Sequence, residues 1–504
     1  MDLSKDATSR VAGVASRLAR LARRIPPALA ALVAIAVGLR VVVALAYRPA
    51  VLTVGDTGAY VTAAAGELFS DPVHTAGYPM FLRAVHALSA SIDLTVAVQH
   101  LLGIASGLVL YATVRRIGAP LWVALLAAIT ILLSLDQIVL EHTLMAETLF
   151  TFGLCVVVYV AVRSLEPARP LVGPVTSRHA WLAAAGLALA LDSWVRAVGA
   201  PLIPFLCLWI AVAIPGAAWT RLARGALTGG VAAVVVLAYM GLNEGASGHF
   251  VLTYAPGWAL YSRTAPFAQC SSFEPPKGTE GLCEQTPTGQ RPGPEFYGYD
   301  PASPARHVFH HPARGDHKLL AFGRTVILHQ PLDYALNVSR DVARYYAPSL
   351  GPERPFWGSG HEVLDIRVRA PEVEQQVQTV VDGYYDSRPL EVGGAADRLG
   401  QLQSLLRAPP LLLLIATLLG GVAAWLASGR RRAEVCLLLG AGLLLLVVPS
   451  ATATYNARYA IPAAPLLAAA GAIGVWLAFE RWISRSPRGI ARGVAGSDRA
   501  AGSV

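Results

Sequence analysis

Ionisable side chains lie inside or directly beside long apolar stretches of this chain, where they are costly and usually functional. Asp56 follows the first apolar stretch, and Glu147 lies about one turn into a later one. Arg196 and Arg458 lie beside two others. A carboxylate can accept a proton from a hydroxyl group, and arginine can hold a phosphate bidentately with permanent charge. The set suits transfer from a phosphate-linked donor whose phosphate is carried on a lipid.

Further ionisable groups accompany this set. Arg40 lies deep in the first apolar stretch, and Asp136, Glu141 and His142 lie in one later turn. The plain alternative is that such residues are loop residues near water or anchors that reach the membrane surface. That alternative is weakest for Glu147, because its side chain is too short to extend from within the span to the membrane surface. For Arg40 a purely structural pairing with a carboxylate is an equally good interpretation.

The elements that must position these residues are membrane-spanning helices. The chain is 54% hydrophobic and 14% charged, against about 25% charged in soluble domains. Apolar stretches near the ~20 residues needed to cross a bilayer recur along it. We therefore predict an all-α polytopic membrane protein with about ten transmembrane helices and a mixed extracytoplasmic domain. The predicted spans are 27–47, 93–113, 119–135, 144–164, 180–194, 198–214, 225–243, 408–427, 434–450 and 459–479. Segment 180–194 is short, so a broken or re-entrant pair with the next span fits equally well.

Arginines gather at one set of span ends, and the other short loops are nearly free of them. By the positive-inside rule both termini are cytoplasmic and the carboxylates and arginines above face outward. The first apolar run is too long for a cleaved signal peptide, so we interpret it as an uncleaved helix. We expect a multi-pass protein of the cell (inner or plasma) membrane with an extracytoplasmic active site.

This topology divides the chain into segments. Residues 244–407 are long and aromatic enough to fold as an extracytoplasmic domain, whose role the sequence does not reveal. The expected division is a basic cytoplasmic N-terminus at 1–26, a transmembrane module at 27–243 with an outer loop at 48–92, the domain at 244–407, C-terminal transmembrane helices at 408–480, and a cytoplasmic tail at 481–504.

The remaining composition limits partners and ligands. The net charge of +9 comes from arginines beside apolar spans, so we expect the lipid bilayer, and no nucleic acid, as a partner. Cys270 and Cys283 are close in the outer segment and are predicted to form a disulfide in an oxidising space, with two free thiols as the alternative. No metal site or certain cofactor is expected, because paired CxxC spacing is absent and the histidines at 307–317 read as a solvated patch.

Four strings, in order, resemble the GT-C superfamily of membrane glycosyltransferases, most closely its RgtA/B/C/D-like or protein-mannosyltransferase-like (glycosyltransferase 39-like) branch. The first, at 55–88, has an acidic residue after the first span and a Gly-Tyr-Pro turn, although Ala76 stands where the family usually has proline. The resemblance covers the N-terminal half and residues 450–480. The other strings are LMAETLFTF at 144–152, WVRAVGAPLIP at 194–204 and NARYAIPAAPLL at 456–467.

The resemblance implies inverting transfer of a sugar from a polyprenyl-phosphate donor to an extracytoplasmic glycan, lipid or protein acceptor. It implies Asp56 as the base, and Arg196 or Arg458 as phosphate ligands. A metal-dependent version is less supported, because Thr57 stands where many branches have a second acidic residue. The catalytic residues expected are Asp56 and Glu147, and the substrate-binding residues expected are Tyr60, His74, Tyr78, Arg196, Arg458 and Tyr459.

Two other functions remain open. A transporter or flippase of lipid-linked substrates typically shows inverted repeats and charges near the bilayer midplane; here no repeat is evident and the charges gather at one face. An inactive GT-C homologue acting as a scaffold would also share these strings. The intact set of carboxylates and arginines favours the enzyme.

Overall fold

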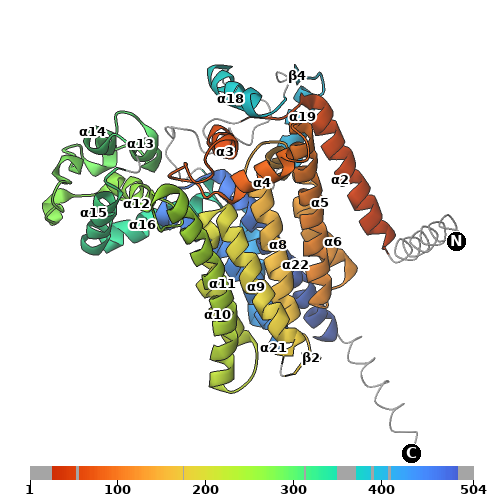
Figure 1. The fold of residues 1–504 in the computed structure, drawn as a ribbon. Coiled ribbons are helices and arrows are strands. Elements are labelled where there is room, and N and C mark those ends of the chain that lie inside the picture. Colours follow the sequence, from red (N-terminus) through yellow and green to blue (C-terminus); the bar gives the residue numbers. More distant parts are fainter. Residues whose placement is uncertain are drawn as a thin grey trace, which may run out of the picture.

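The computed structural model describes residues 25–52, 56–173, 175–311, 314–348, 371–386, 391–406 and 410–485. Its helices form an upright bundle with a second group of helices beside one end (Figure 1). Most of the predicted cytoplasmic segments 1–26 and 481–504 lies outside these residues. The bundle helices are α2 (Pro27–Ala46), α5 (Ile92–Arg116), α6 (Leu121–Leu132), α7 (Leu135–Glu141), α8 (Glu147–Ser164), α9 (Ser177–Val195), α10 (Leu202–Ala213), α11 (Ala218–Ser247), α20 (Pro410–Leu426), α21 (Gly429–Thr452) and α22 (Ala460–Arg485).

Shorter elements cap the bundle or build the second group. Two small antiparallel pairs join β1 to β4 and β2 to β3. The helices are α3 (Asp56–Ala65), α4 (Gly77–His86), α12 (Pro256–Thr264), α13 (Pro294–Tyr299), α14 (Pro304–Phe309), α15 (Asp316–His329), α16 (Pro331–Arg344), α18 (Pro371–Tyr384) and α19 (Ala396–Leu406). The 3₁₀ turns are η1 (Ala197–Gly199), η2 (Ala265–Phe267), η3 (Cys270–Ser272), η4 (Glu280–Leu282), η5 (Thr288–Gln290) and η7 (Ala457–Tyr459). The strands are β1 (Tyr47–Arg48), β2 (Pro170–Val172), β3 (Val175–Thr176) and β4 (Glu391–Val392).

The chain is a multi-pass helical membrane protein, as predicted. Among the described residues six helices are long and apolar enough to cross a membrane, and α6 with α7, bent by 50°, raises this to up to seven. The other predicted spans are also helical, but α10 and α20 are shorter than the ~20 residues that span a bilayer. Helix α9 carries Arg178, His179 and Asp192, which lower its hydropathy. The expected ten spans therefore exceed what length and hydropathy support.

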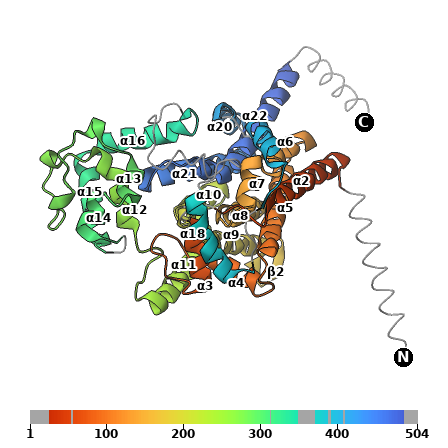
Figure 2. The same ribbon diagram turned by 90° about the horizontal axis from the view of Figure 1, so that it is seen from above.

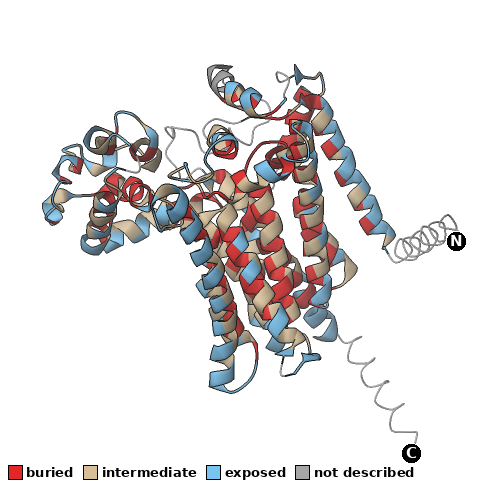
Figure 3. Ribbon diagram, viewed as in Figure 1, coloured by how far each residue is buried: buried red, intermediate tan, exposed pale blue. Residues whose placement is uncertain are grey.

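Close helix contacts in the bundle depend on small residues, as is common where helices pack in lipid. A Cβ on Gly474 of α22 would lie 2.2 Å from the Leu419 carbonyl oxygen of α20, and one on Gly186 of α9 would lie 2.3 Å from the Thr228 carbonyl oxygen of α11. Figure 3 shows buried residues concentrated in the middle of the bundle and exposed ones along α2 and α11. The exposed apolar side chains on these outer helices, such as Val234 and Leu237, suit contact with lipid.

The arginine-rich helix ends lie at one end of the bundle, as the topology prediction requires. Arg116 at the end of α5 and Arg163 at the end of α8 both pair with Glu166, with N–O distances of 2.7 and 3.4 Å. Helices α3 and α4 lie at the opposite end (Figure 1). Which end faces the cytoplasm stays a prediction from the positive-inside rule.

The described parts of the predicted 244–407 domain pack in three places, one of which is α19 against α2 and α7. Helices α12–α16 lie beside the bundle in both views (Figures 1 and 2) and have their own core, with Tyr261, Tyr297 and Phe322 at its centre. Cys270 and Cys283 are joined there by a disulfide, with the Cα atoms 5.9 Å apart. Helix α18 lies instead over α3 (Figure 1), and residues 377–385 share a core with α3 and α4. Residues 349–370, between α16 and α18, lie outside the described residues.

Candidate active site

Asp56 is the first residue of α3, where a carboxylate is favoured by the helix dipole. The helix is held by Tyr60, which packs edge-on against Tyr78 with ring centroids 4.9 Å apart. Asp56 Oδ2 lies 2.5 Å from Arg458 Nη1, and Asp56 Oδ1 lies 3.5 Å from His74 Nε2. One carboxylate oxygen therefore faces a guanidinium and the other an imidazole.

Glu147 is the first residue of α8 and is buried. It forms an ion pair with Arg196, and its Oε1 lies 3.6 Å from Arg458 Nε. Arg196 ends α9 with an extended backbone before η1 begins, so its side chain leaves the helix at this break. Both guanidinium groups also lie near the Tyr459 ring, at 5.4 Å for Arg196 and 5.5 Å for Arg458. Two arginines from distant segments thus share two carboxylates and one aromatic ring.

These residues line a single cavity of about 480 Å³. Its charged lining comes from α3, the loop after α3, α8, the α9–η1 break and η7. Its apolar lining includes Leu445, Val448 and Pro449, which lie on the membrane-spanning helix α21. The cavity therefore joins a charged set at the α3 end of the bundle to an apolar wall inside it.

Charge within the site alters the acidity of its loop residues. Burial raises the pKa of Asp56, but the Arg458 guanidinium and the His74 imidazolium outweigh burial and hold that pKa well below its usual range. Burial lowers the pKa of His74, but the neighbouring Asp56 and Asp71 carboxylates raise it to about 10. Asp56 is therefore ionised and His74 protonated at neutral pH.

The structure brings most of the predicted site residues together. The expected substrate contact of Tyr78 does not agree with its position: the side chain is fully buried behind Tyr60, and its hydroxyl donates to Gln99 Oε1 at 2.8 Å. The reason is that Tyr78 lies on the buried face of α4, together with Leu82 and Val85. The predicted residues that line the cavity are Asp56, Tyr60, His74, Glu147, Arg196, Arg458 and Tyr459.

Two residues at or behind the cavity were missed by the sequence interpretation. Tyr299 reaches the cavity from α13, and that helix is held to the bundle by a 2.5 Å hydrogen bond that Thr454 Oγ1 donates to Glu295 Oε1. No sequence signal marks Tyr299. Asp71 accepts from His74, and its spacing of three residues before a loop histidine is a signal that was available.

The other ionisable residues singled out in the sequence do not line the site cavity; these are Arg40, Asp136, Glu141 and His142. Arg40 forms a bidentate pair with Glu141, with N–O distances of 2.7 Å for both contacts. His100 contacts Glu141 Oε2 at 3.0 Å and His142 at 3.1 Å. This buried cluster, which we call the Arg40 clamp, joins α2, α5 and α7. The structure therefore agrees with the interpretation that Arg40 forms a structural pair with a carboxylate.

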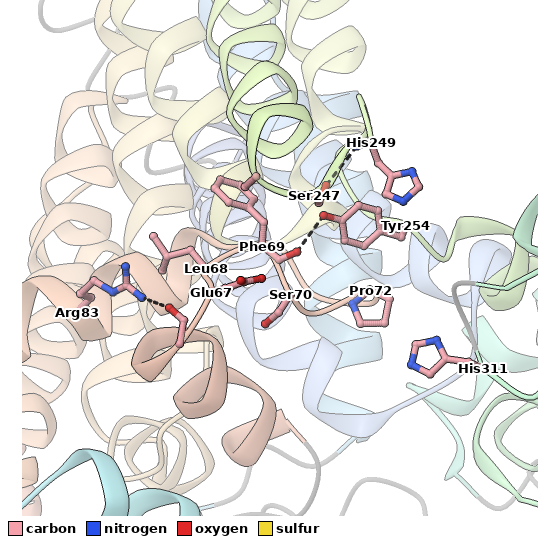
Figure 4. Close-up of a pocket in the computed structure, with 12 residues that line it drawn as sticks. Glu67, Leu68, Phe69, Ser70, Pro72, Arg83, Ser247, His249, Tyr254 and His311 are labelled. Carbon is pink, nitrogen blue, oxygen red and sulfur yellow. Dashed lines mark hydrogen bonds between the residues drawn. The ribbon is translucent and has the colours of Figure 1, made fainter.

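A second cavity of about 690 Å³ lies next to the site (Figure 4). It is lined by the loop after α3, the end of α11 and His311, which follows α14, and Tyr254 donates to the Phe69 carbonyl at 2.9 Å across it. Pro72 lines this cavity while Val73 lines the site cavity. The backbone hydrogen bond from Tyr254 N to Pro72 O, at 3.0 Å, therefore lies in the wall between the two.

The described residues contain no group of three or more His, Cys, Asp or Glu side chains arranged to hold a metal ion. The arrangement instead offers a carboxylate for proton transfer and two guanidinium groups for an anion.

Comparisons with known proteins add a distant structural likeness. The chain is similar to the crystal structure of the Archaeoglobus fulgidus oligosaccharyltransferase tethered by a disulfide to an acceptor peptide containing the NVT sequon, with 12% identity and a TM-score of 0.43. The match covers 91% of this chain and 51% of that one, so the chain spans about half that protein's length. No family model and no curated protein matches it. The geometry of the site therefore carries the functional argument.

Proposed function

We propose that this protein is a GT-C-type glycosyltransferase that moves a sugar from a polyprenyl-phosphate donor to an extracytoplasmic acceptor with inversion. One observation carries the proposal: Asp56, Glu147, Arg196 and Arg458 line one cavity although they come from four distant segments. Each belongs to one of the four strings that resemble the GT-C superfamily. A shared chemical site is the simplest reason for these strings to meet.

The two kinds of cavity lining suit the two parts of such a donor. Arg196 and Arg458 offer a paired guanidinium site for a phosphate. The apolar side chains of Leu445 and Val448 on α21 suit the first isoprene units next to that phosphate. A water-soluble donor such as a nucleotide sugar would gain nothing from this wall.

Transfer follows from the positions of these groups. Asp56 accepts the proton of an acceptor hydroxyl or amide, and the acceptor atom attacks the anomeric carbon from the face opposite the phosphate. A new bond forms between acceptor and sugar, the bond between sugar and phosphate breaks, and its electron pair leaves on the phosphate oxygen. Arg196 and Arg458 stabilise the charge that develops there.

Before donor binding, Arg458 is occupied by Asp56 at 2.5 Å and by Glu147 at 3.6 Å. A phosphate that takes Arg458 has to compete with Asp56 for it. Its arrival would release Asp56 Oδ2 and weaken the positive field that holds the Asp56 pKa low. Donor binding therefore prepares the base, and the donor is expected to bind before the acceptor.

The test uses purified protein in lipid nanodiscs with a panel of short-chain polyprenyl-phosphate monosaccharides. Glycans, lipids and peptides are offered as acceptors, and water serves where none is taken. At least one donor should release polyprenyl phosphate, and proton NMR should show the inverted anomer in the product. Retention of configuration would contradict the mechanism. Consumption of no donor, together with movement of a lipid-linked sugar across proteoliposomes, would favour the transporter.

A further inference from the structure

The loop between α3 and α4 carries an acid–imidazole–acid chain that ends at Asp56. Asp71 Oδ2 lies 2.9 Å from His74 Nδ1, and His74 Nε2 lies 3.5 Å from Asp56 Oδ1. Both nitrogens of one imidazole are therefore directed to carboxylates. A protonated histidine can serve both, because both of its ring nitrogens are then donors.

The position of His74 is fixed from several directions. Asp71 Oδ1 accepts backbone hydrogen bonds from Val73 at 2.7 Å and from His74 at 2.8 Å, so Asp71 caps the turn that presents the imidazole. The imidazole also packs on Tyr60, with ring centroids 4.9 Å apart. The loop itself is tied to the segment after α11 by the Tyr254 N–Pro72 O hydrogen bond. Because the His74 imidazole is fixed in this way, it can hold the Asp56 carboxylate in one orientation.

We propose that Asp71 and His74 are positioning residues that hold Asp56 Oδ1, so that Asp56 Oδ2 is the oxygen presented to the acceptor. The inference rests on the proposed function and changes the expected role of His74, which was substrate binding. Oδ2 is the oxygen that Arg458 contacts, and it becomes free when the donor phosphate takes that arginine. His74 keeps its contact throughout the reaction.

His74 is poorly suited to be the base itself. A base needs an unprotonated nitrogen, and the two carboxylates raise the pKa of His74 to about 10. Its positive charge also has a measurable effect on Asp56. The groups facing Asp56 are His74 from the loop, Arg458 from η7, Glu147 from α8, Tyr60 from α3 and Tyr299 from α13. Removing the imidazolium should let the pKa of Asp56 rise.

The direction of the resulting pH dependence follows. The base works only when ionised, so activity falls on acidification through the pKa of Asp56. Loss of one nearby cation typically raises a carboxyl pKa by about one unit or more. The acidic limb of the pH–rate profile should therefore move to higher pH when His74 is replaced by a neutral side chain.

The experiment compares His74→Gln and Asp71→Asn with the unchanged protein in nanodiscs, at several pH values. Both variants should lower kcat about 10-fold to 100-fold, because misplacement of a reacting group carries costs of that size. Donor affinity at neutral pH should change less than about threefold, and the acidic limb should move upward in His74→Gln. A raised donor KM with unchanged kcat and an unmoved acidic limb would make His74 a substrate contact and overturn the proposal.

A binding measurement gives a second readout that needs no turnover. Short-chain polyprenyl phosphate, titrated at neutral pH, should bind His74→Gln within about threefold of the unchanged protein, because His74 contacts Asp56 rather than the donor. A loss of about tenfold or more, seen in His74→Gln and again when His74→Gln is added to Asp56→Asn, would make His74 a donor contact and overturn the proposal. Asp56→Asn separates the two ideas: full activity in that variant defeats the role of Asp56 as the base in the proposed function, whereas its inactivity together with lost donor affinity in His74→Gln defeats only the role of His74.

Discussion

The candidate active site and the Arg40 clamp are both built from arginines and buried carboxylates at the same end of the bundle, yet the site residues line a cavity of about 480 Å³, whereas Arg40 and Glu141 do not line it. In the clamp, Arg40 binds both oxygens of Glu141 and donates to the Ala36 and Leu132 carbonyls at 3.0 Å each. In the site, Glu147 forms an ion pair with Arg196 and its Oε1 lies 3.6 Å from Arg458 Nε, while Arg458 also contacts Asp56. All four residues line the cavity.

This difference separates a structural ion pair from one kept available for a ligand. A carboxylate whose two oxygens are both held by one arginine gains little from a ligand, whereas Arg458 lies between two carboxylates beside a cavity in which a phosphate can compete for it. The sequence placed Glu147 inside a span and Glu141 in a turn, but it did not show which of them pairs with Arg40.

The largest effect is expected for Asp56→Asn. This change keeps the size and polarity of the side chain and removes its basicity, so transfer should fall by about 10²–10⁴. Donor binding should be kept or improved, because Arg458 loses a competitor. The measurement is the rate of polyprenyl-phosphate release, with Asp386→Asn, an exposed carboxylate away from the cavity, as the matched control. Activity near that of the control would transfer the role of base to Glu147.

Variants of the Arg40 clamp should lower the stability of the fold and leave the turnover of the folded protein nearly unchanged. Arg40→Ala leaves Glu141 buried without its main partner, which commonly costs about 3–5 kcal/mol. Unfolding in mixed micelles should show this loss, while activity per folded molecule stays within about twofold of the unchanged protein. The double variant Arg40→Ala, Glu141→Ala should recover part of the stability, because no uncompensated charge remains. A selective loss of turnover in stable Arg40→Ala protein would contradict the division drawn here.

Arg458→Ala tests the other side of the comparison. Truncating one partner of a charge pair of this kind costs about 2–5 kcal/mol of binding, so affinity for short-chain polyprenyl phosphate should fall accordingly. Arg458→Lys should fail to restore it if the contact is bidentate. Arg163→Ala, at the opposite end of the bundle, is the matched control and should bind normally. Unchanged phosphate affinity in Arg458→Ala would remove this residue from the donor site.

The smallest effect is expected when the two glutamates are compared directly. Glu147→Gln removes a charge that Arg196 and Arg458 share and should lower turnover less than Asp56→Asn does, because it alters their orientation and leaves the base in place. Glu141→Gln should leave turnover unchanged and lower stability. Steady-state kinetics and micelle unfolding on both variants give the comparison. Equal kinetic effects would show that lining the cavity does not distinguish the two regions.

Hydropathy and charge in the sequence were enough to predict the helical membrane architecture. Each predicted span corresponds to a helix. The length of an apolar stretch and the arginines at its ends are local features of the sequence, and they are the features that decide whether a segment crosses a bilayer and in which direction. The same local signals identified Asp56, Glu147, Arg196 and Arg458, since a charge beside an apolar span is visible in a single stretch of residues. The alternation of arginine-rich and arginine-poor span ends predicted that they share one face.

Only the tertiary structure decided which of these charges meet. The pairing of Arg40 with Glu141, about 100 residues away along the chain, and of Arg458 with Asp56, about 400 away, depends on how the helices pack, and a local pattern carries no record of it. The same packing buried Tyr78, placed Tyr299 of α13 in the lining of the site cavity, and brought Asp71 into contact with His74. Hydropathy and charge predicted that ionisable residues lie beside membrane-spanning helices; packing determined which of them form an enclosed structural pair and which line a cavity.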